Sequence, residues 1–381
     1  MIRGVFFSQI KPNERSQGAV QKVFDEIAAF EKEGYEIHHV NVEPVSTGLR
    51  ATHLGRAFCA MVPFTYVFSG YRYDRSLDGY DFYYLRFEAA DRWLIHMLKM
   101  LRKNNPSAKI LIEFPNYPNN AWMVMPWCFP LLLKDIMARP EYKKCIDRFV
   151  VLDKAYPVIY DVPTLHYTNG IDVSRIPVRK PCNKPDDRMI SIVGVATMFP
   201  SHGYERLIES MNVYYKGGGD RNVVFHVVGE GPGPELKKYM ELVARYGLSE
   251  HVVFEGTLYG DRLTECYNKC DLALDDLCGF RIGLEISSSL KSREYLAYGL
   301  PIIAACHIDI LMDKEFKYLL KLENDDSLID LRRIIDFYDS IYLDESTEAV
   351  IGNIRRFAQN NCSYSSTLRN VFSYIESEQN E

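Results

Sequence analysis

Short apolar runs alternate with longer amphipathic stretches along most of this chain, which is typical of parallel sheets with crossover helices. In the first half, the pattern predicts strands at residues 4–7, 36–42, 81–84, 109–113 and 148–152, and helices at 20–32 and 91–103. In the second half, it predicts strands at 189–195, 223–228, 252–254, 271–274 and 301–304, and helices at 204–215 and 234–246. The stretch from about residue 327 onward is predicted to be helical.

A segment rich in Pro, Asn and Asp, residues 156–185, separates the two halves and contains Asn169-Gly170-Ile171-Asp172. The 381 residues are enough for two domains of ordinary size. We therefore predict an α/β protein with two Rossmann-like doubly wound domains joined near residue 170 and facing each other across a cleft. In such sheets ligands bind at the carboxyl ends of the strands.

Composition narrows the class of protein. A net charge of -6 argues against general binding to nucleic acid. The nine cysteines have scattered spacings, and we expect reduced thiols in a cytoplasmic protein. Cys266 and Cys270, four apart on a predicted helix, do not form a metal-type pair. The first residues read as a core strand and not as a signal peptide, and no apolar stretch is long enough to span a membrane.

The most informative stretch is residues 287–301, SSSLKSREYLAYGLP. It predicts a two-turn helix with Ser289 as N-cap and Gly299 just past its end. Lys291 and Glu294 are three apart and share one helix face. A diphosphate suits such a helix N-terminus, and the carboxylate could bind two ribose hydroxyls. The alternative is a capped surface helix whose Lys/Glu pair is solvated.

Three further loops each join a predicted strand to a helix. Val228–Pro234 contains three glycines that would let its backbone approach a base or phosphate. The loop after Gly194 carries Ser201, His202 and Arg206, which could face an anion. Gly18 could bring backbone close to a phosphate from the first domain. Ordinary turns and surface pairs are the alternative for each loop.

Several motifs of other enzyme classes are missing from the sequence. There is no nucleophile elbow and no Walker loop. Asp275 and Asp276 are adjacent and not interleaved as in a metal-binding aspartate pair, so domain packing or a loop cap is the favoured interpretation. We therefore predict that no metal is required.

Taken together, the segments of the second half resemble the retaining glycosyltransferases of the GT-B architecture, in the large family 4. The resemblance rests on the Gly194 loop with His202-Gly203, on Asn169–Asp172, and on four segments in register: VVGEGP at 227–232, VVFEGTL at 252–258, YNKCDLAL at 267–274 and LKSREYLAYGLPII at 290–303. In the first half, residues 83–86 and 113–118 resemble stretches of bacterial members that build surface polysaccharides.

The resemblance implies a role for each matching residue. Glu294 would hold the ribose, and Lys291 with the backbone near Ser289 and Leu290 would meet the diphosphate. The donor would also contact the following residues: Gly18, Gly194, His202, Arg206, Glu230, Thr257, Leu258 and Arg281. Arg86, Glu113 and Tyr117 would lie on the acceptor side. The last helix, about 351–375, would cross back to the first domain, giving expected domains of 1–170 and 171–350 with a crossing helix at 351–381.

The chain departs from the family pattern at two places. Many relatives carry two glutamates separated by seven residues, but position 286 is Ile here, and the nearest acid is Glu285. Relatives also often carry Arg and Lys after the first strand of the second domain, where this chain has Val195 or Ala196 and His202. The catalytic residue is therefore left open, with His202, Arg206 and Arg281 as candidates for stabilising the departing diphosphate.

The expected activity is transfer of a sugar from a nucleotide-diphosphate-sugar, with UDP or GDP as the nucleotide, to a saccharide or polyprenyl-linked saccharide. By analogy the protein would work in the cytoplasm, with possible peripheral contact to the inner membrane face. A basic run from Lys134 to Arg148 could meet anionic lipid, but its interspersed acids favour a solvated helix face. A nucleotide-sugar epimerase of the same fold and a non-catalytic partner protein remain the alternatives; a phosphorylase would need a longer chain.

Overall fold

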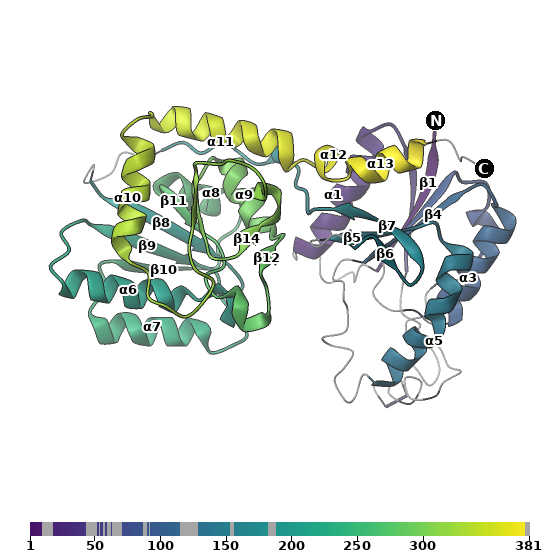
Figure 1. Cartoon of the computed structure of the whole chain (residues 1–381), viewed down its shortest axis with the longest axis horizontal. Coiled ribbons are helices and arrows are strands. Elements are labelled where there is room, and N and C mark those ends of the chain that lie inside the picture. Colours follow the sequence, from purple (N-terminus) through teal and green to yellow (C-terminus); the bar gives the residue numbers. More distant parts are fainter. Residues whose placement is uncertain are drawn as a thin grey trace. The chain divides into compact units, whose positions relative to one another are not determined.

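The computed structural model describes residues 1–9, 18–42, 71–86, 92–114, 129–152, 156–181 and 188–377, with a few isolated positions between 52 and 90. The chain divides into two compact units. Unit 1 comprises Met1–Thr168 and Thr367–Glu381, and unit 2 comprises Asn169–Ser366. The change of unit at Thr168 lies close to the boundary that the Pro- and Asn-rich segment predicts. Each unit consists of a β-sheet with helices packed on both of its faces (Figure 1).

Unit 1 is built on a seven-stranded sheet in the order β2-β1-β3-β4-β5-β7-β6, in which all neighbours are parallel except β6 and β7. Its strands are β1 (Arg3–Ser8), β2 (Glu36–Asn41), β3 (Phe82–Arg86), β4 (Lys109–Phe114), β5 (Arg148–Leu152), β6 (Val158–Ile159) and β7 (Val162–Tyr167). Its helices are α1 (Gly18–Lys32), α3 (Arg92–Asn104), α5 (Phe129–Cys145), α12 (Tyr364–Thr367), which straddles the unit boundary, α13 (Arg369–Glu376) and the 3-10 turn η3 (Arg75–Leu77).

Alternating side chains of the unit 1 strands pack on opposite faces of the sheet. Phe7 and Leu85 belong to the core under α3 and α5. Phe6 stacks on Tyr84 on the other face, where Phe30 of α1 meets Phe372 of α13 edge to face. The C-terminal helix is thus part of the unit 1 core.

Lys109 of β4 connects the sheet to the C-terminal end of α13 through hydrogen bonds. Its ammonium donates to the carbonyls of Tyr374 at 2.6 Å and Ile375 at 3.2 Å, and also to that of Ser377. A cation suits the carbonyl end of a helix. The structure corrects the expected domain limits here, because the predicted single helix at 351–375 is three helices. The chain returns to unit 1 at Thr367 and not at residue 351.

Unit 2 is built on a six-stranded parallel sheet in the order β10-β9-β8-β11-β13-β15. Its strands are β8 (Ile190–Val195), β9 (Val223–Val228), β10 (Val252–Gly256), β11 (Leu272–Leu274), β13 (Ile302–Ala304) and β15 (Leu319–Lys321), and a separate pair joins β12 (Ile286–Ser287) to β14 (His307–Ile308). Its helices are α6 (Tyr204–Lys216), α7 (Glu235–Tyr246), α8 (Gly260–Lys269), α9 (Leu290–Tyr298), α10 (Leu331–Tyr342) and α11 (Thr347–Asn361), with 3-10 turns η4 (Val173–Arg175), η5 (Pro200–His202), η6 (Gly279–Ile282) and η7 (Asp309–Leu311).

The two faces of the unit 2 sheet have separate cores. Ile192 and Leu274 pack with α6, α7 and α10, whereas Val193 and Ala273 pack with α8, α9 and α11. This strand order is that of the doubly wound Rossmann fold, as the sequence predicts. From β8 the chain proceeds toward one edge of the sheet, and from β11 it proceeds toward the other edge, so the point between these two strands is the topological switch point. A ligand crevice is therefore expected outside the carboxyl ends of β8 and β11.

Candidate functional site

Helix α9 begins at the predicted place. The Ser289 hydroxyl accepts a hydrogen bond from the backbone N–H of Ser292 at 3.3 Å, and Gly299 ends the helix with φ +83°. Both predicted caps are confirmed. Tyr295 fixes α9 to the switch point, since its hydroxyl accepts from the N–H of Val195 at 2.9 Å and lies 3.3 Å from the Leu274 carbonyl. The N-terminus of α9 thus lies beside the carboxyl ends of β8 and β11.

The motif at the start of unit 2 supports this helix from its other side. Asn169 donates from its backbone N–H to the Ser288 hydroxyl at 3.1 Å and from its amide to the Ser288 carbonyl at 2.6 Å. The buried Arg293 donates to the Asn169 carbonyl at 3.0 Å and pairs with Asp309. The sequence marked Asn169 only as part of a linker, but the residue holds the loop that leads into α9.

Lys291 lies in the first turn of α9 with an ammonium that is already partnered. Its Nζ is 3.1 Å from Asp275 and 2.8 Å from Asp276, and the side chain is 13% exposed. Burial lowers the pKa of Lys291, but the two carboxylates raise it overall, well above its usual value. The sequence interpretation of Asp275 and Asp276 as domain packing or a loop cap missed this pairing. The one available signal was two acids directly after a buried strand that ends at the switch point.

His202 joins the same group. Its Nδ1 accepts from the backbone N–H of Phe199 at 3.0 Å, which leaves Nε2 facing Asp276 at 3.5 Å. Burial and the nearby Lys291 ammonium lower the pKa of His202 to about 3. The imidazole is therefore neutral near pH 7 and does not replace a lysine as a cation.

Glu294 is on the next turn of α9 and differs from the other acids of the site. Burial raises the pKa of its carboxyl to about 7. No hydrogen bond or ion pair to another described residue satisfies this carboxylate. A half-buried acid without a partner pays a desolvation cost that a ligand with hydroxyl donors would offset.

Arg206 does not face the site, which contradicts the prediction for this residue. Its side chain is 2% exposed, and it donates to the carbonyls of Leu277 at 2.7 Å, Glu323 at 2.9 Å and Ser327. The other two N–H groups donate to the Asp325 carboxylate and the Ser327 hydroxyl, each at 3.3 Å, so the guanidinium has no N–H left for a diphosphate. Arg206 therefore holds the loop after β15 in place.

Arg281 is held on the surface by two acids. It lies 2.6 Å from Glu205 and also pairs with Asp326. Burial lowers its pKa, but the hydrogen bonds to the two acids raise it overall above the usual value. These contacts place Arg281 against α6 and the 325–327 loop, so a role toward an anion would require it to leave them.

The glycine loops form a connected wall beside β8. Met198 donates to the Glu230 carbonyl at 2.9 Å, and Gly229 donates to the Gly256 carbonyl at 2.8 Å. Gly229 has φ +111°, and a Cβ there would lie 2.0 Å from the Ala196 carbonyl oxygen. Glycine is thus required for this close approach of backbones. The Glu230 side chain is exposed on this wall.

The remaining donor-binding candidates of unit 2 differ in how far they are exposed to solvent. Gly194 is the second-last residue of β8, and a Cβ added to it would lie 2.7 Å from the Tyr204 ring. Thr257 is exposed after β10, whereas the Leu258 side chain is buried in the core with Tyr267. A donor contact from Leu258 is therefore limited to its backbone.

In unit 1, two acceptor-side candidates lie together in a buried cluster. Arg86 is 3.4 Å from Glu26 and 3.9 Å from Glu113, and Lys22 is 3.4 Å from Glu26. Burial raises the pKa of Glu26 to about 7, and the nearby Glu113 adds to this. Glu113 is fully buried and accepts from the Tyr84 and Tyr167 hydroxyls, so it does not face solvent. Gly18 begins α1, and Tyr117 lies outside the described residues.

Among the described residues, one group has metal-ligand donors close together: His226, Glu255 and Cys266, whose donor atoms all lie within 4.8 Å. His226 Nδ1 is 2.8 Å from the Glu255 carboxylate. The structure thus brings Cys266 beside a histidine that the sequence spacing did not connect to it. The group is on the α8 side of the sheet, and that a metal is not required stays a prediction.

The predicted basic run extends from α5 to the start of β5: Lys134 is buried, Arg148 is the first residue of β5, and the other three cations pair with acids. Arg139 is 2.9 Å from Asp135, Lys143 is 3.0 Å from Asp161, and Lys144 is 2.9 Å from Glu141. These pairs fit the solvated helix face better than a surface for anionic lipid. In the described part of the chain, every helix is too short or too polar to cross a membrane.

Residues 188–332 match the family model for glycosyl transferases group 1. No curated protein matches the chain. The family match covers most of unit 2 and shows that residues 188–332 are similar to a glycosyl transferase group 1 domain.

Solved structures with the same fold include HepE of Anabaena in complex with UDP and glucose, 13% identical, with a TM-score of 0.58 over 99% of this chain and 100% of that one. Sucrose-phosphate synthase from Thermosynechococcus elongatus is 14% identical, with a TM-score of 0.57 over 98% of both chains. A glycosyltransferase from Rickettsia africae is 13% identical, with a TM-score of 0.56 over 98% of both chains. The two-domain GT-B fold is thereby confirmed.

Proposed function

We propose that this glycosyltransferase moves a sugar from a nucleotide-diphosphate-sugar, with UDP or GDP as the nucleotide, to a saccharide or polyprenyl-linked saccharide acceptor. The transfer is retaining and metal-independent. It serves cell-surface polysaccharide synthesis at the cytoplasmic face of the membrane. The coarser part of the proposal, a glycosyltransferase that uses a nucleotide-sugar, rests on the group 1 domain and the shared fold.

The unpartnered carboxylate of Glu294 carries the proposal. It lies one turn inside a helix whose N-terminus meets the switch point of a doubly wound sheet, where nucleotides bind in this architecture. A carboxylate accepts hydrogen bonds from both hydroxyls of a ribose. HepE of Anabaena, solved with UDP and with UDP-glucose, supports a uridine nucleotide as the first donor to test.

The diphosphate would lie on the first turn of α9, where free backbone N–H groups and the helix dipole favour negative charge. Lys291 supplies the cation, but Asp275 and Asp276 share it. An ammonium has three donors, so one N–H remains for a phosphate oxygen while the carboxylates hold the other two. The acids thus orient Lys291, but the three side chains together carry a net negative charge, so the attraction for the diphosphate comes from the helix N-terminus and the remaining N–H of Lys291.

Chemically, this arrangement stabilises the departing diphosphate and leaves the acceptor proton to the donor's own phosphate. Neutral His202 can contribute a hydrogen bond through Nε2, but not a charge. Glu113, buried in unit 1, is not available as a general base at a solvent-exposed acceptor. The residues that can be named therefore bind and orient the donor, which is the larger share of the catalytic task in diphosphate displacement.

A binding experiment tests the proposal first. Thermal shift and calorimetric titration of the full chain with UDP, GDP, CDP and dTDP should identify one nucleotide that raises the melting temperature. Glu294→Gln should weaken that nucleotide by tenfold or more, because a charged hydrogen bond contributes about 1.5–3 kcal/mol. The matched control is Glu250→Gln, an exposed glutamate before the amino end of β10, which should change nothing.

Turnover separates the remaining alternatives. Incubation of the wild type with the nucleotide-sugar and a polyprenyl-linked saccharide should release nucleoside diphosphate and extend the acceptor. Release of sugar without an acceptor would instead indicate an epimerase. Nucleotide binding that is unaffected by Glu294→Gln would overturn the assigned site.

A further inference from the structure

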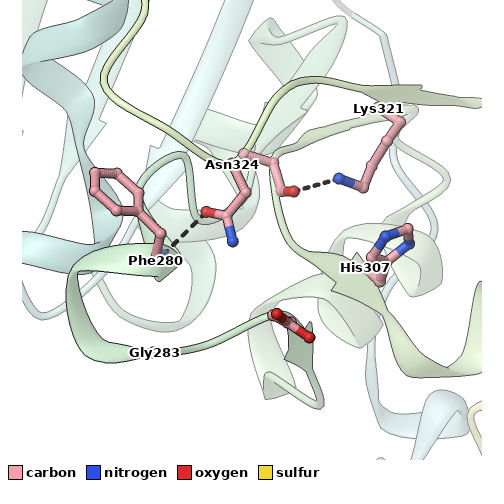
Figure 2. A pocket seen from close by; sticks show the side chains of 7 residues that line it. Phe280, Gly283, His307, Lys321 and Asn324 are labelled. Atoms are coloured by element: carbon pink, nitrogen blue, oxygen red, sulfur yellow. Dashed lines mark hydrogen bonds between the residues drawn. The ribbon is translucent and has the colours of Figure 1, made fainter.

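The cavity at the carboxyl end of the unit 2 sheet adjoins the Lys291 group and is therefore part of the candidate donor site. It has a volume of about 440 Å³ and is lined, among others, by Phe280, His307, Lys321 and Asn324 (Figure 2). It also contacts Ala305, whose N–H donates to the carbonyl of Asp276, a partner of Lys291. The donor roles do not use a second group of side chains, which lies toward the opposite edge of the same sheet.

This second group consists of His226, Glu255 and Cys266, each from a different element. His226 is in β9, Glu255 is in the edge strand β10, and Cys266 is in α8. One ring nitrogen, one carboxylate oxygen and the sulfur all lie within 4.8 Å of one another. Imidazole, carboxylate and thiolate are the ligands that proteins use for Zn²⁺. The fold therefore brings together a donor set suited to zinc from positions that are distant in the sequence.

The backbone of β10 is irregular at the residue that supplies the carboxylate. Phe254 pairs with Val227 of β9 and Gly256 pairs with Val228, so Glu255 is one extra residue in the ladder. A bulge of this kind re-aims a side chain and is frequent beside functional sites. Here the Glu255 carboxylate lies 2.8 Å from Nδ1 of the His226 ring. A ligand shared by these two side chains would explain the irregularity.

The three side chains keep the capacity to bind an ion. Among the described residues, the side chains of His226 and Glu255 have only each other as hydrogen-bond partners. The side chain of Glu255 is 28% exposed and that of His226 is 14% exposed, whereas Cys266 is 4% exposed. An ion can therefore reach the group from solvent on the Glu255 side and would be enclosed at the sulfur.

A second cysteine lies beside the sulfur of Cys266. The two thiols form a hydrogen bond, and burial together with this bond raises the pKa of Cys270 well above its usual value. Cys270 therefore stays protonated and can donate its S–H to a Cys266 thiolate. Hydrogen-bond partners of a metal ligand orient it, and their loss typically lowers metal affinity by about 10–100-fold. The spacing of four residues thus supplies one ligand and one supporting thiol.

The distances fit a tetrahedral ion after small side-chain movements. Zinc–ligand bonds of about 2.0–2.3 Å place the donor atoms of such a site roughly 3.3–3.8 Å apart. His226 and Glu255 would separate slightly from 2.8 Å, and a donor pair at the 4.8 Å limit would approach by about 1 Å. Zinc displaces the thiol proton of Cys266 to solvent and binds the thiolate. Water completes the fourth position, as in zinc sites with three protein ligands.

We propose that His226, Glu255 and Cys266 bind one Zn²⁺ ion, which fixes helix α8 to the outer strands β9 and β10. Thiolate and imidazole ligands favour zinc over Mg²⁺ and Ca²⁺, which prefer oxygen. Glu255 precedes the turn that contains Thr257 and Leu258, and Cys266 follows it, so the ion holds both sides of this turn. The ion is structural, and it takes no part in the sugar transfer.

The test uses the full chain, stripped with EDTA and then dialysed against zinc chloride. Elemental analysis should find one zinc ion per chain. Zinc should also raise the melting temperature by several degrees, because the three ligands come together only in the folded form. Competition with a chromophoric chelator gives the affinity. At least about tenfold weaker zinc binding is expected, since loss of a supporting group alone costs about 10–100-fold, in each of the variants His226→Ala, Glu255→Gln and Cys266→Ser.

Each variant has a matched control in unit 2 that changes the same residue type outside the group. The controls should bind zinc as the wild type does, and they are His307→Ala, Glu250→Gln and Cys362→Ser.

Cobalt gives a readout that a loss of stability cannot imitate. Co²⁺ in place of zinc should produce a thiolate-to-cobalt absorption band in the near ultraviolet, because its sulfur ligand is the Cys266 thiolate. Cys266→Ser should abolish this band and Cys362→Ser should keep it. Glu255→Gln changes a partly exposed side chain, so the zinc affinity of this variant decides the question if Cys266→Ser fails to fold.

The proposal is overturned if the wild type neither retains zinc nor gains stability from it. It is also overturned if the three ligand variants bind zinc as tightly as their controls, because the ion would then lie on other thiols. These measurements use neither a nucleotide nor an acceptor, so their outcome is independent of the proposed function.

Discussion

Glu294 should make donor affinity depend on pH near neutrality. Burial raises the pKa of its carboxyl to about 7 in the free protein. Only the ionised form accepts hydrogen bonds from both ribose hydroxyls, so binding selects that form. Donor affinity should therefore rise with pH between 6 and 8, and Glu294→Gln should remove this dependence.

The magnitude follows from the pKa. With a value of about 7, the ionised fraction is about 0.1 at pH 6 and about 0.9 at pH 8. Affinity should thus increase about tenfold over this range, or about 1.4 kcal/mol. At pH 8, Glu294→Gln should weaken binding by tenfold or more.

The free energy of unfolding of the ligand-free protein should instead decrease as the pH rises, as far as it depends on Glu294. The folded pKa of about 7 lies above the ordinary value of 4.5, so this group favours folding at low pH. That contribution is fully present below about pH 4.5 and is lost as pH rises through 7, with an upper limit of about 3 kcal/mol. Comparing the wild type with Glu294→Gln isolates this effect from other titrating groups.

Calorimetry with the best-binding nucleotide-sugar is the appropriate assay, because a sugar-diphosphate diester does not titrate between pH 6 and 8 as a free nucleotide does. Chemical denaturation of the same proteins gives the free energy of unfolding. The reasoning would be refuted by an affinity that is flat from pH 6 to 8 in the wild type, or by the same slope in Glu294→Gln. The Glu250→Gln protein should follow the wild type throughout.

Three other predictions test the neighbouring structure. Lys291→Met leaves two buried carboxylates unpaired and should lower the free energy of unfolding by about 3–5 kcal/mol in a denaturation assay, with partial recovery on adding Asp276→Asn; a fully stable single variant would contradict the pairing. Gly229→Ala places a Cβ 2.0 Å from the Ala196 carbonyl oxygen at φ +111°, so its melting temperature should fall by several degrees and nucleotide affinity with it; an unchanged melt would argue against the close loop contact. Turnover should survive EDTA and gain nothing from Mg²⁺ or Mn²⁺, also in His226→Ala; activity that is lost with EDTA and restored by Mn²⁺ would disprove metal independence.

Much of the fold could be predicted because buried parallel strands appear as continuous apolar runs. The predicted strands at 189–195 and 223–228 correspond to β8 and β9 almost residue for residue. The sequence pattern does not predict β7, because the middle residues of this strand are only partly buried and the strand lies in the Pro-rich segment between the two halves. The family resemblance implies one helix at about 351–375, whereas the chain forms α11, α12 and α13 in this stretch.

In the site, the sequence predicts the features that depend on local contacts within one helix, but not those that depend on contacts between distant segments. The Ser289 cap and the shared face of Lys291 and Glu294 follow from helix geometry alone. The acids that hold Lys291 belong to another strand end, and only the fold brings them to it. The expectation for Arg206 is wrong for the same reason, because its carbonyl partners lie in loops that the sequence of its own helix does not predict.

The return of the chain to its first unit determines how the protein can be divided for study. Unit 2 is one uninterrupted stretch, whereas unit 1 is assembled from both ends of the polypeptide. A recombinant fragment that stops at Thr168 would lose the Phe372 ring from its core and leave the Lys109 ammonium without its carbonyl partners. A ribosome would likewise finish the second unit before the first could close, so the amino-terminal half completes its folding last.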